Sequence, residues 1–198
     1  MSINRKISSP IKVGFLTPSL QLGGAERWML SLAKNTNPKR IEWVGTALSE
    51  WAYSSPQLCK ELVQYMPIYG GPAHGDPKLH DLESVTRLKP DASVAINKVA
   101  SEADVVISWG GYYLDTMLCN YIQHYGIRSI TVSHCDGPAN EFAAYEAGAT
   151  NFAAVCEAAK AVFSPKTRIS TEVIHNGADV NRCVPTAPKE VLKERYGL

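Results

Sequence analysis

Three places in the sequence put small, aromatic or ionisable residues where a ligand could be bound. Gly23 and Gly24 are adjacent and precede an amphipathic segment, so a phosphate could approach free N–H groups at the start of a helix. His134 directly follows a short apolar run, and an imidazole can donate, accept or shuttle a proton near neutral pH. Trp109 and Gly110 follow another apolar run, and an indole beside a glycine could stack on a sugar or a base.

Each of these places also has a structural interpretation. Adjacent glycines suit a plain tight turn, and the sequence has neither the third glycine of Gly-x-Gly-x-x-Gly nor the Gly-Lys-Ser/Thr of a P-loop. A single histidine often serves packing, but Asp136 and a Gly-Pro turn beside His134 make a ligand-binding role an equal alternative. Packing is also the commoner role of a tryptophan such as Trp109.

Two further candidates lie nearer the C-terminus. Glu157 opens a predicted helix, where a carboxylate stabilises the helix start whether or not it contacts a ligand. Asn176 and Gly177 form a turn signal. The sequence shows no His/Cys/Asp cluster with metal-ligand spacing and no Asp-x-Asp pair, so we expect no metal site.

The composition is that of a soluble globular domain, with 198 residues, 45% of them hydrophobic and 20% charged. The net charge of +1 gives no overall attraction to nucleic acid. The five cysteines include no Cys-x-x-Cys pair, which favours a reducing compartment over a disulfide framework. No stretch approaches the roughly 18 apolar residues of a membrane span. We therefore expect a cytoplasmic protein, with peripheral contact at the inner membrane face left open.

The elements that must position these residues alternate between two kinds of segment. Apolar residues at successive positions indicate strands covered on both faces, as in a parallel sheet, at 11–16, 43–48, 105–108, 129–132, 152–155 and 172–174. Helical stripes lie between them, at 25–33, 92–103, 114–125 and 158–163. This alternation predicts an α/β fold with a doubly wound, mainly parallel, Rossmann-like sheet, in which ligands bind at the carboxyl ends of the strands.

The Gly- and Pro-rich stretch 49–90 is the least regular part of the sequence. A strand near 63–68 followed by a long loop is our expectation there.

Taken in order, four segments resemble the N-terminal domain of a GT-B glycosyltransferase of family 4, the large retaining group. Residues 11–33 (IKVGFLTPSLQLGGAERWMLSLA) resemble its opening strand, Gly-Gly-Ala-Glu turn and first helix. Residues 130–134 resemble the strand that ends in the active-site histidine of the family. Residues 152–158 (FAAVCEA) resemble the strand that ends in a Ser-Glu pair, and 173–179 (VIHNGAD) the Pro-Asn-Gly-Val-Asp segment that closes the domain.

Small departures accompany the resemblance. Cys156 stands where the family usually has serine, and His175 where it usually has proline, whereas Glu157, Asn176 and Gly177 are kept.

The resemblance implies transfer of a sugar from a nucleoside diphosphate sugar (of UDP, GDP or ADP) to an acceptor, with retained anomeric configuration and without a metal or other cofactor. It gives His134 a hydrogen-bonding, catalytic role at the transferred sugar and places Gly23 and Gly24 against the donor diphosphate. The predicted donor contacts are Gly23, Gly24, Asn176 and Gly177. The predicted substrate contacts are Trp109, Gly110, Asp136 and Glu157.

The resemblance also predicts the domain organisation. Residues 1–188 would form the acceptor-side domain, and 189–198 a charged helix, closed by Gly197, that leads into a C-terminal donor-binding domain beyond Leu198. The partners would be the nucleotide sugar, a glycan or lipid-linked acceptor and that second domain, without nucleic acid. We expect these 198 residues alone to be inactive.

Two other functions share the fold class. A dinucleotide-dependent oxidoreductase domain needs a fuller glycine fingerprint and an acidic residue about 20 positions on, usually ending the second strand. Glu42 is the residue nominated for that role, but it begins the second predicted strand. The other alternative is a non-catalytic module that binds a nucleotide or a sugar.

Overall fold

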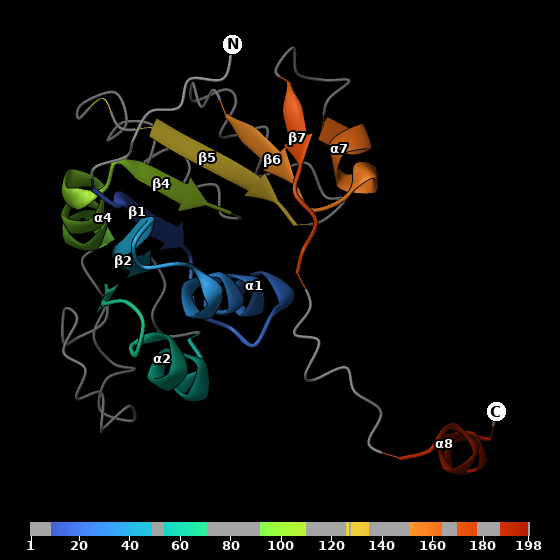
Figure 1. Cartoon of the computed structure of the whole chain (residues 1–198). Coiled ribbons are helices and arrows are strands. Elements are labelled where there is room, and N and C mark those ends of the chain that lie inside the picture. Colours follow the sequence, from blue (N-terminus) through green and yellow to red (C-terminus); the bar gives the residue numbers. More distant parts are fainter. Residues whose placement is uncertain are drawn as a thin grey trace.

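A computed structural model shows a parallel sheet with helices on both of its faces (Figure 1). It describes residues 9–48, 54–70, 92–109, 126, 128–134, 151–163, 170–177 and 187–197. The strands are β1 (Ile11–Thr17), β2 (Ile41–Leu48), β3 (Ile68–Tyr69), β4 (Val105–Ser108), β5 (Arg128–Ser133), β6 (Phe152–Ala154) and β7 (Thr171–Val173). The helices are α1 (Gly24–Asn35), α2 (Pro56–Leu62), α4 (Ala92–Glu102), α7 (Glu157–Phe163) and α8 (Lys189–Tyr196).

The strand order identifies where this sheet could bind a ligand. The seven strands are parallel and lie in the order β3-β2-β1-β4-β5-β6-β7. The chain therefore builds outward from β1 to β3, returns to the other side of β1, and builds outward again from β4. This is the predicted doubly wound, Rossmann-like arrangement. Its topological switch point is between β1 and β4, the place where such sheets form a ligand crevice.

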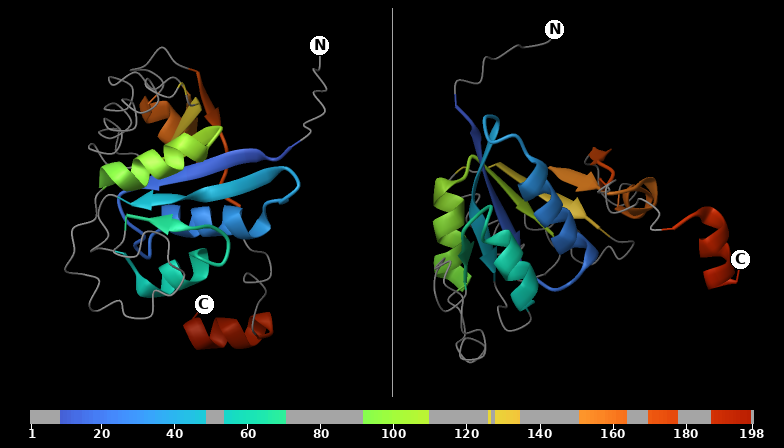
Figure 2. Two further views of the ribbon diagram at one scale, coloured as in Figure 1. Left: turned by 90° about the vertical axis from the view of Figure 1, so that its left-hand side faces the viewer. Right: turned by 60° about the horizontal axis from the view of Figure 1, so that its bottom comes forward.

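Both faces of the central strands are buried, which explains why their apolar residues are consecutive. One core lies under α1 and α2, and its fully buried members are Phe15, Leu20, Met29, Leu48, Cys59 and Leu62. The second core lies under α4, and its most buried members are Leu16, Ala47, Ala95, Ile96, Val99 and Val106. Figure 2 shows α4 on the opposite side of the sheet from α1 and α2.

A glycine in β1 sets how closely the second core packs. A Cβ at Gly14 would clash with the Cγ1 atom of Val99 in α4. Because only glycine leaves that space, α4 can lie directly against β1 and cover the switch point from behind.

The predicted strands are confirmed to within two residues at either end, but the stretch after β2 differs from the prediction. Residues 63–66 form a turn, and β3 is short. The segment before them is α2, which begins with an N-cap: the backbone N–H of Leu58 donates to Ser55 Oγ over 3.5 Å, and Pro56 takes the first helical position. These are ordinary helix-start signals, hidden by the many Gly and Pro residues around them. The predicted helix 114–125 lies outside the described residues. Gly126, which directly follows that range, has a φ of +66°, the left-handed conformation common at a helix C-terminus.

The helix predicted near the C-terminus is confirmed as α8. It ends at Gly197, whose φ of 67° is left-handed and whose N–H bonds the carbonyls of Lys193 and Glu194. None of its side chains is buried, and it stands apart from the sheet (Figures 1 and 2). The division into 1–188 and 189–198 stays a prediction. Within the described part of the chain, no helix combines the length and apolar character needed to cross a membrane.

Candidate functional site

The carboxyl edge of the sheet gathers residues from distant parts of the sequence. Gly23 follows β1, Trp109 follows β4, His134 follows β5, Glu157 follows β6, and Asn176 follows β7. Because neighbouring strands are about 4.8 Å apart, the first three lie around the switch point, whereas the last two lie one and two strands farther out. The edge therefore has a switch-point end, formed by the segments that follow β1, β4 and β5, and an outer end, formed by those that follow β6 and β7.

At the switch-point end, His134 packs against two indole rings. Its ring centroid lies 4.9 Å from that of Trp28 in α1, at an interplanar angle of 70°. The centroid of Trp109 lies 5.9 Å away, at 67°. The two indoles meet each other edge-on at 5.9 Å and 90°. The imidazole is therefore held by edge-to-face contacts from two different elements, a favoured geometry for aromatic pairs.

The ring of Phe15 in β1 supports this arrangement from the core. It contacts Trp28 at 6.2 Å and Trp109 at 5.7 Å, and it stacks on Trp43 of β2 at 4.9 Å. We call these four rings, with His134, the aromatic cluster. It joins α1, β1, β2, β4 and β5 at the point where the ligand crevice is expected.

Burial controls the charge of the histidine. It lowers the pKa of His134 from 6.5 to about 4, and no charged side chain of the described residues adds to that shift. The Nε2 atom is covered and has no hydrogen-bond partner in the part of the chain that the structure describes. At neutral pH the imidazole is therefore uncharged, and it can exchange hydrogen bonds with a substrate but cannot offer it a positive charge.

Trp109 is part of the core. Its side chain is only 6% exposed, and it contacts Phe15, Trp28 and His134. This burial favours the packing role over stacking on a sugar or a base.

The glycine turn after β1 has a carboxylate of the protein, that of Glu26, beside it. Gly23 is the N-cap of α1 and, as a glycine, has no capping side chain. The carboxylate of Glu26, three residues on, folds back over Gly23, within reach of the backbone N–H groups of Gly23 and of Glu26 itself. A Cβ at Gly23 would clash with Glu26 Oε2, whereas the space beside Gly24 is open. This is half of a capping box, and its spacing in the sequence was the signal that could have revealed it.

The environment of Glu26 opposes its charge. Its pKa is raised, because desolvation by burial outweighs the two backbone hydrogen bonds that lower it. A half-buried carboxylate thus shares the helix start that we predict for a donor phosphate.

Hydrogen bonds hold the turn in place. Thr17 Oγ1 donates to the carbonyl of Ser19 over 3.1 Å, and the N–H of Leu20 donates to Ser54 Oγ over 3.0 Å. The N–H of Ser55 donates back to the carbonyl of Leu20 over 2.7 Å. The side chain of Leu20 is fully buried, so the turn is fixed both to α2 and to the core.

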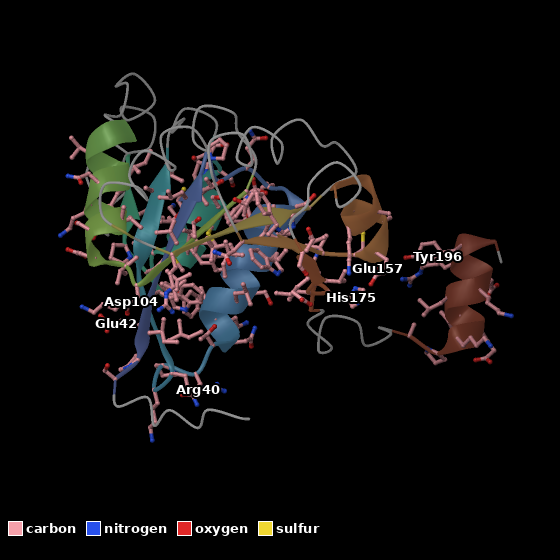
Figure 3. All side chains as sticks on the ribbon, turned by 90° about the horizontal axis from the view of Figure 1, so that it is seen from above. Arg40, Glu42, Asp104, Glu157, His175 and Tyr196 are labelled. Atoms are coloured by element: carbon pink, nitrogen blue, oxygen red, sulfur yellow. The ribbon has the colours of Figure 1, made fainter. Side chains whose placement is uncertain are left out.

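The outer end differs from the switch-point end in burial. Glu157, Asn176 and Gly177 are all exposed. Figure 3 shows Glu157 and His175 on the α7 side of the molecule. Cys156 Sγ accepts a hydrogen bond from the N–H of Ala159 over 3.4 Å and so caps α7 in the way a serine would. Gly110 and Asp136 lie outside the described residues.

The acidic residue nominated for a dinucleotide site is at the wrong edge. Glu42 is the second residue of β2 and pairs in register with Lys12, near the start of β1. The N–H of Lys12 donates to Asp104 Oδ2 over 2.9 Å, and Asp104 precedes β4. Figure 3 shows Glu42 and Asp104 together, away from Glu157. Glu42 therefore cannot reach a ligand at the carboxyl edge. Among the described residues, no group of three or more His, Cys, Asp or Glu side chains could hold a metal ion.

Comparison with known proteins supports the fold. The chain is similar to Alr3699/HepE from Anabaena, solved in complex with UDP, with a TM-score of 0.62 and 18% identity. The similarity covers 94% of this chain and 50% of HepE, so the chain spans about half the length of that protein. MurG from Acinetobacter baumannii is similar over 84% of this chain and 45% of MurG, with a TM-score of 0.42 and 18% identity. No family model matches the sequence, and no curated protein matches it. The likeness to HepE confirms the α/β, Rossmann-like fold.

Proposed function

We propose that this chain is the acceptor-side domain of a GT-B glycosyltransferase of family 4 that transfers a sugar from a nucleoside diphosphate sugar with retention. The observation that carries the proposal is a neutral His134 beside the switch point. His134 follows β5, Trp109 follows the neighbouring strand β4, and the Gly23-Gly24 turn follows β1, the next strand along. The likeness of the fold to half of a UDP-bound protein adds support.

The chemistry follows from the charges of the site. A neutral imidazole at His134 exchanges a hydrogen bond with a hydroxyl of the transferred sugar and does not act as a cation. The leaving diphosphate is stabilised by backbone N–H groups at the start of α1, beside the open space at Gly24, and by cations of a second domain. Catalysis of this kind is electrostatic, and the protein supplies no nucleophile.

The proposed function also implies the substrates, a second domain and a cellular location. The donor carries UDP, GDP or ADP, and the acceptor is a glycan or a lipid-linked acceptor. The exposed helix α8 leads into the donor-binding domain. The enzyme works in the cytoplasm, and contact with the inner face of the membrane stays an open alternative.

Thermal stabilisation by ligands tests this proposal on the full-length gene product. One family of sugar nucleotides (UDP, GDP or ADP sugars) is expected to raise the melting temperature, since a ligand at a hundred times its Kd adds about 2.7 kcal/mol to stability. NAD should leave the melting temperature unchanged, because Glu42 is at the opposite edge. Stabilisation by NAD and by no sugar nucleotide would favour the oxidoreductase function. Binding of a sugar nucleotide without any sugar transfer or hydrolysis would identify a non-catalytic module.

A further inference from the structure

Trp28 connects the glycine turn to the histidine. It lies in the second turn of α1, the helix that Gly23 caps, and its ring contacts Phe15, Trp109 and His134. Of the two indoles beside the imidazole, Trp28 is the nearer, at 4.9 Å against 5.9 Å. Trp28 therefore links α1 directly to the ring of His134.

The buried Nε2 atom of His134 has few possible hydrogen-bond partners. Nε2 is buried and has no hydrogen-bond partner in the described part of the chain. A buried polar atom without a partner costs about 1–3 kcal/mol, so the ring is expected to adopt the protonation state that costs least. An N–H directed at the face of an aromatic ring recovers part of this cost, and the edge-to-face contact with Trp28 permits that geometry. A bare lone pair directed at the same negative face would be repelled.

We propose that Trp28 is a positioning residue that holds the His134 imidazole with its proton on Nε2, turned toward the indole, so that Nδ1 is left to accept a hydrogen bond from the transferred sugar. A neutral imidazole has one donor and one acceptor, so a proton on Nε2 makes Nδ1 the acceptor. The substrate hydroxyl then acts as the donor. The identity of that ligand rests on the proposed function, whereas the tautomer is a property of the free protein.

Trp43 is a matched control that tests whether Trp28 acts only through packing. Both indoles are half-buried, and both pack on Phe15, at 6.2 Å for Trp28 and 4.9 Å for Trp43. Among the described ring contacts, Trp28 and Trp109 reach His134, and Trp43 does not. Loss of either Trp28 or Trp43 removes a similar aromatic from the same core, so an effect on His134 that is specific to Trp28 separates positioning from packing.

Nitrogen-15 NMR of the imidazole side chains tests the tautomer. The chain has five histidines, and the signal lost in His134→Gln identifies the one of interest. In the wild type we expect the shifts of a neutral Nε2–H tautomer at pH 7 and a titration midpoint well below 6.5. Trp28→Leu is expected to raise that midpoint by at least one pH unit and to mix the two tautomers. Trp28→Phe should restore most of the wild-type signal, and Trp43→Leu should leave it unchanged.

Three results would overturn the proposal: an Nδ1–H tautomer in the wild type, an equal effect of Trp43→Leu and Trp28→Leu, or a failure of Trp28→Phe to restore the signal. Circular dichroism checks that each variant is folded. If Trp28→Leu does not fold, the wild-type tautomer and Trp28→Phe still decide the outcome. These readings need no substrate, so absence of sugar transfer would remove the proposed function and leave the positioning role standing. In an active full-length enzyme, Trp28→Leu should lower kcat more than it raises KM.

Discussion

The two ends of the carboxyl edge are built differently. At the switch-point end, His134 and Trp109 belong to the aromatic cluster and the turn before Gly23 is tied to α2, so the fold itself fixes these groups. At the outer end, Glu157 and Asn176 are exposed and follow three-residue strands. The candidate groups at the switch point are therefore preorganised by packing, whereas those at the outer end lie exposed at the surface.

The largest effect should come from removing the centre of the aromatic cluster. Phe15→Ala deletes a fully buried ring that contacts three indoles, and it should lower the free energy of unfolding by about 3–5 kcal/mol. Ile174→Ala, at a side chain that is 56% exposed at the outer end, should change it by less than about 0.5 kcal/mol. Urea denaturation measures both. Comparable losses at the two positions would refute the contrast between the two ends.

Acid should weaken the switch-point end through His134. Its folded pKa is about 4, whereas the ordinary pKa of a histidine is 6.5, so the unfolded chain binds a proton that the folded chain excludes. This contribution to stability is complete above pH 6.5 and is lost as the pH falls toward 4. It is at most about 3 kcal/mol, and smaller because the ring is only partly enclosed.

Two variants distinguish the loss of stability in acid that is due to His134 from the loss that is due to other groups. The loss of stability between pH 7 and pH 4.5 should be smaller in His134→Gln than in the wild type, whereas His175→Gln, at an exposed position, should behave as the wild type does. Urea denaturation at the two pH values gives these differences. An equal acid loss in His134→Gln and the wild type would show that the ring is not kept neutral by burial.

Two cysteines, Cys156 at the outer end and Cys59 in the first core, make the next comparison. Cys156→Ser keeps the cap of α7 and gives it a better acceptor, so it should raise the free energy of unfolding by about 0.5–1 kcal/mol. Cys59→Ser should lower it, because the position is fully buried in the first core and a hydroxyl there loses its solvation. Burial also raises the pKa of the Cys59 thiol to about 12, so Cys156 should react first with a thiol reagent at pH 8. Faster labelling of Cys59 would contradict this order.

The smallest effect is expected at Glu26. Burial raises its pKa, which means that the fold favours the neutral side chain, so Glu26→Gln should change stability by less than about 0.5 kcal/mol. Glu26→Ala removes the acceptor for the Gly23 N–H and should cost about 0.5–1 kcal/mol. Thermal unfolding of the two variants compares them directly. A loss in Glu26→Gln as large as that in Glu26→Ala would show that the negative charge itself holds the turn.

Local patterns predicted much of this structure. Consecutive apolar residues identified β1 and β4, and the charged run closed by Gly197 identified α8. The position of His134 at the carboxyl edge followed from the parallel sheet alone. In each case the interactions that form the element lie within the segment itself or follow from the geometry of a parallel sheet. The sequence of one segment is therefore sufficient to predict the element.

Two features were within reach of the sequence and were missed. Ser55 followed by Pro56 is a helix start, and Gly23 followed three residues later by Glu26 has capping-box spacing. The contact between Trp28 and His134 could not be predicted from the sequence, because it joins a helix to the end of a strand that lies far away in the chain. Only the packing of α1 on the sheet brings the two rings together.

The role that we propose for His134 is sugar transfer from a nucleoside diphosphate sugar at the switch-point end. Release of nucleoside diphosphate by the full-length gene product, measured over UDP, GDP and ADP sugars with acceptor extracts, tests it most directly. We expect turnover of one nucleotide class, a loss of roughly 10²-fold in kcat in His134→Ala, and near wild-type turnover in His175→Gln. Turnover that is unchanged in His134→Ala, or no turnover of any sugar nucleotide, would contradict it.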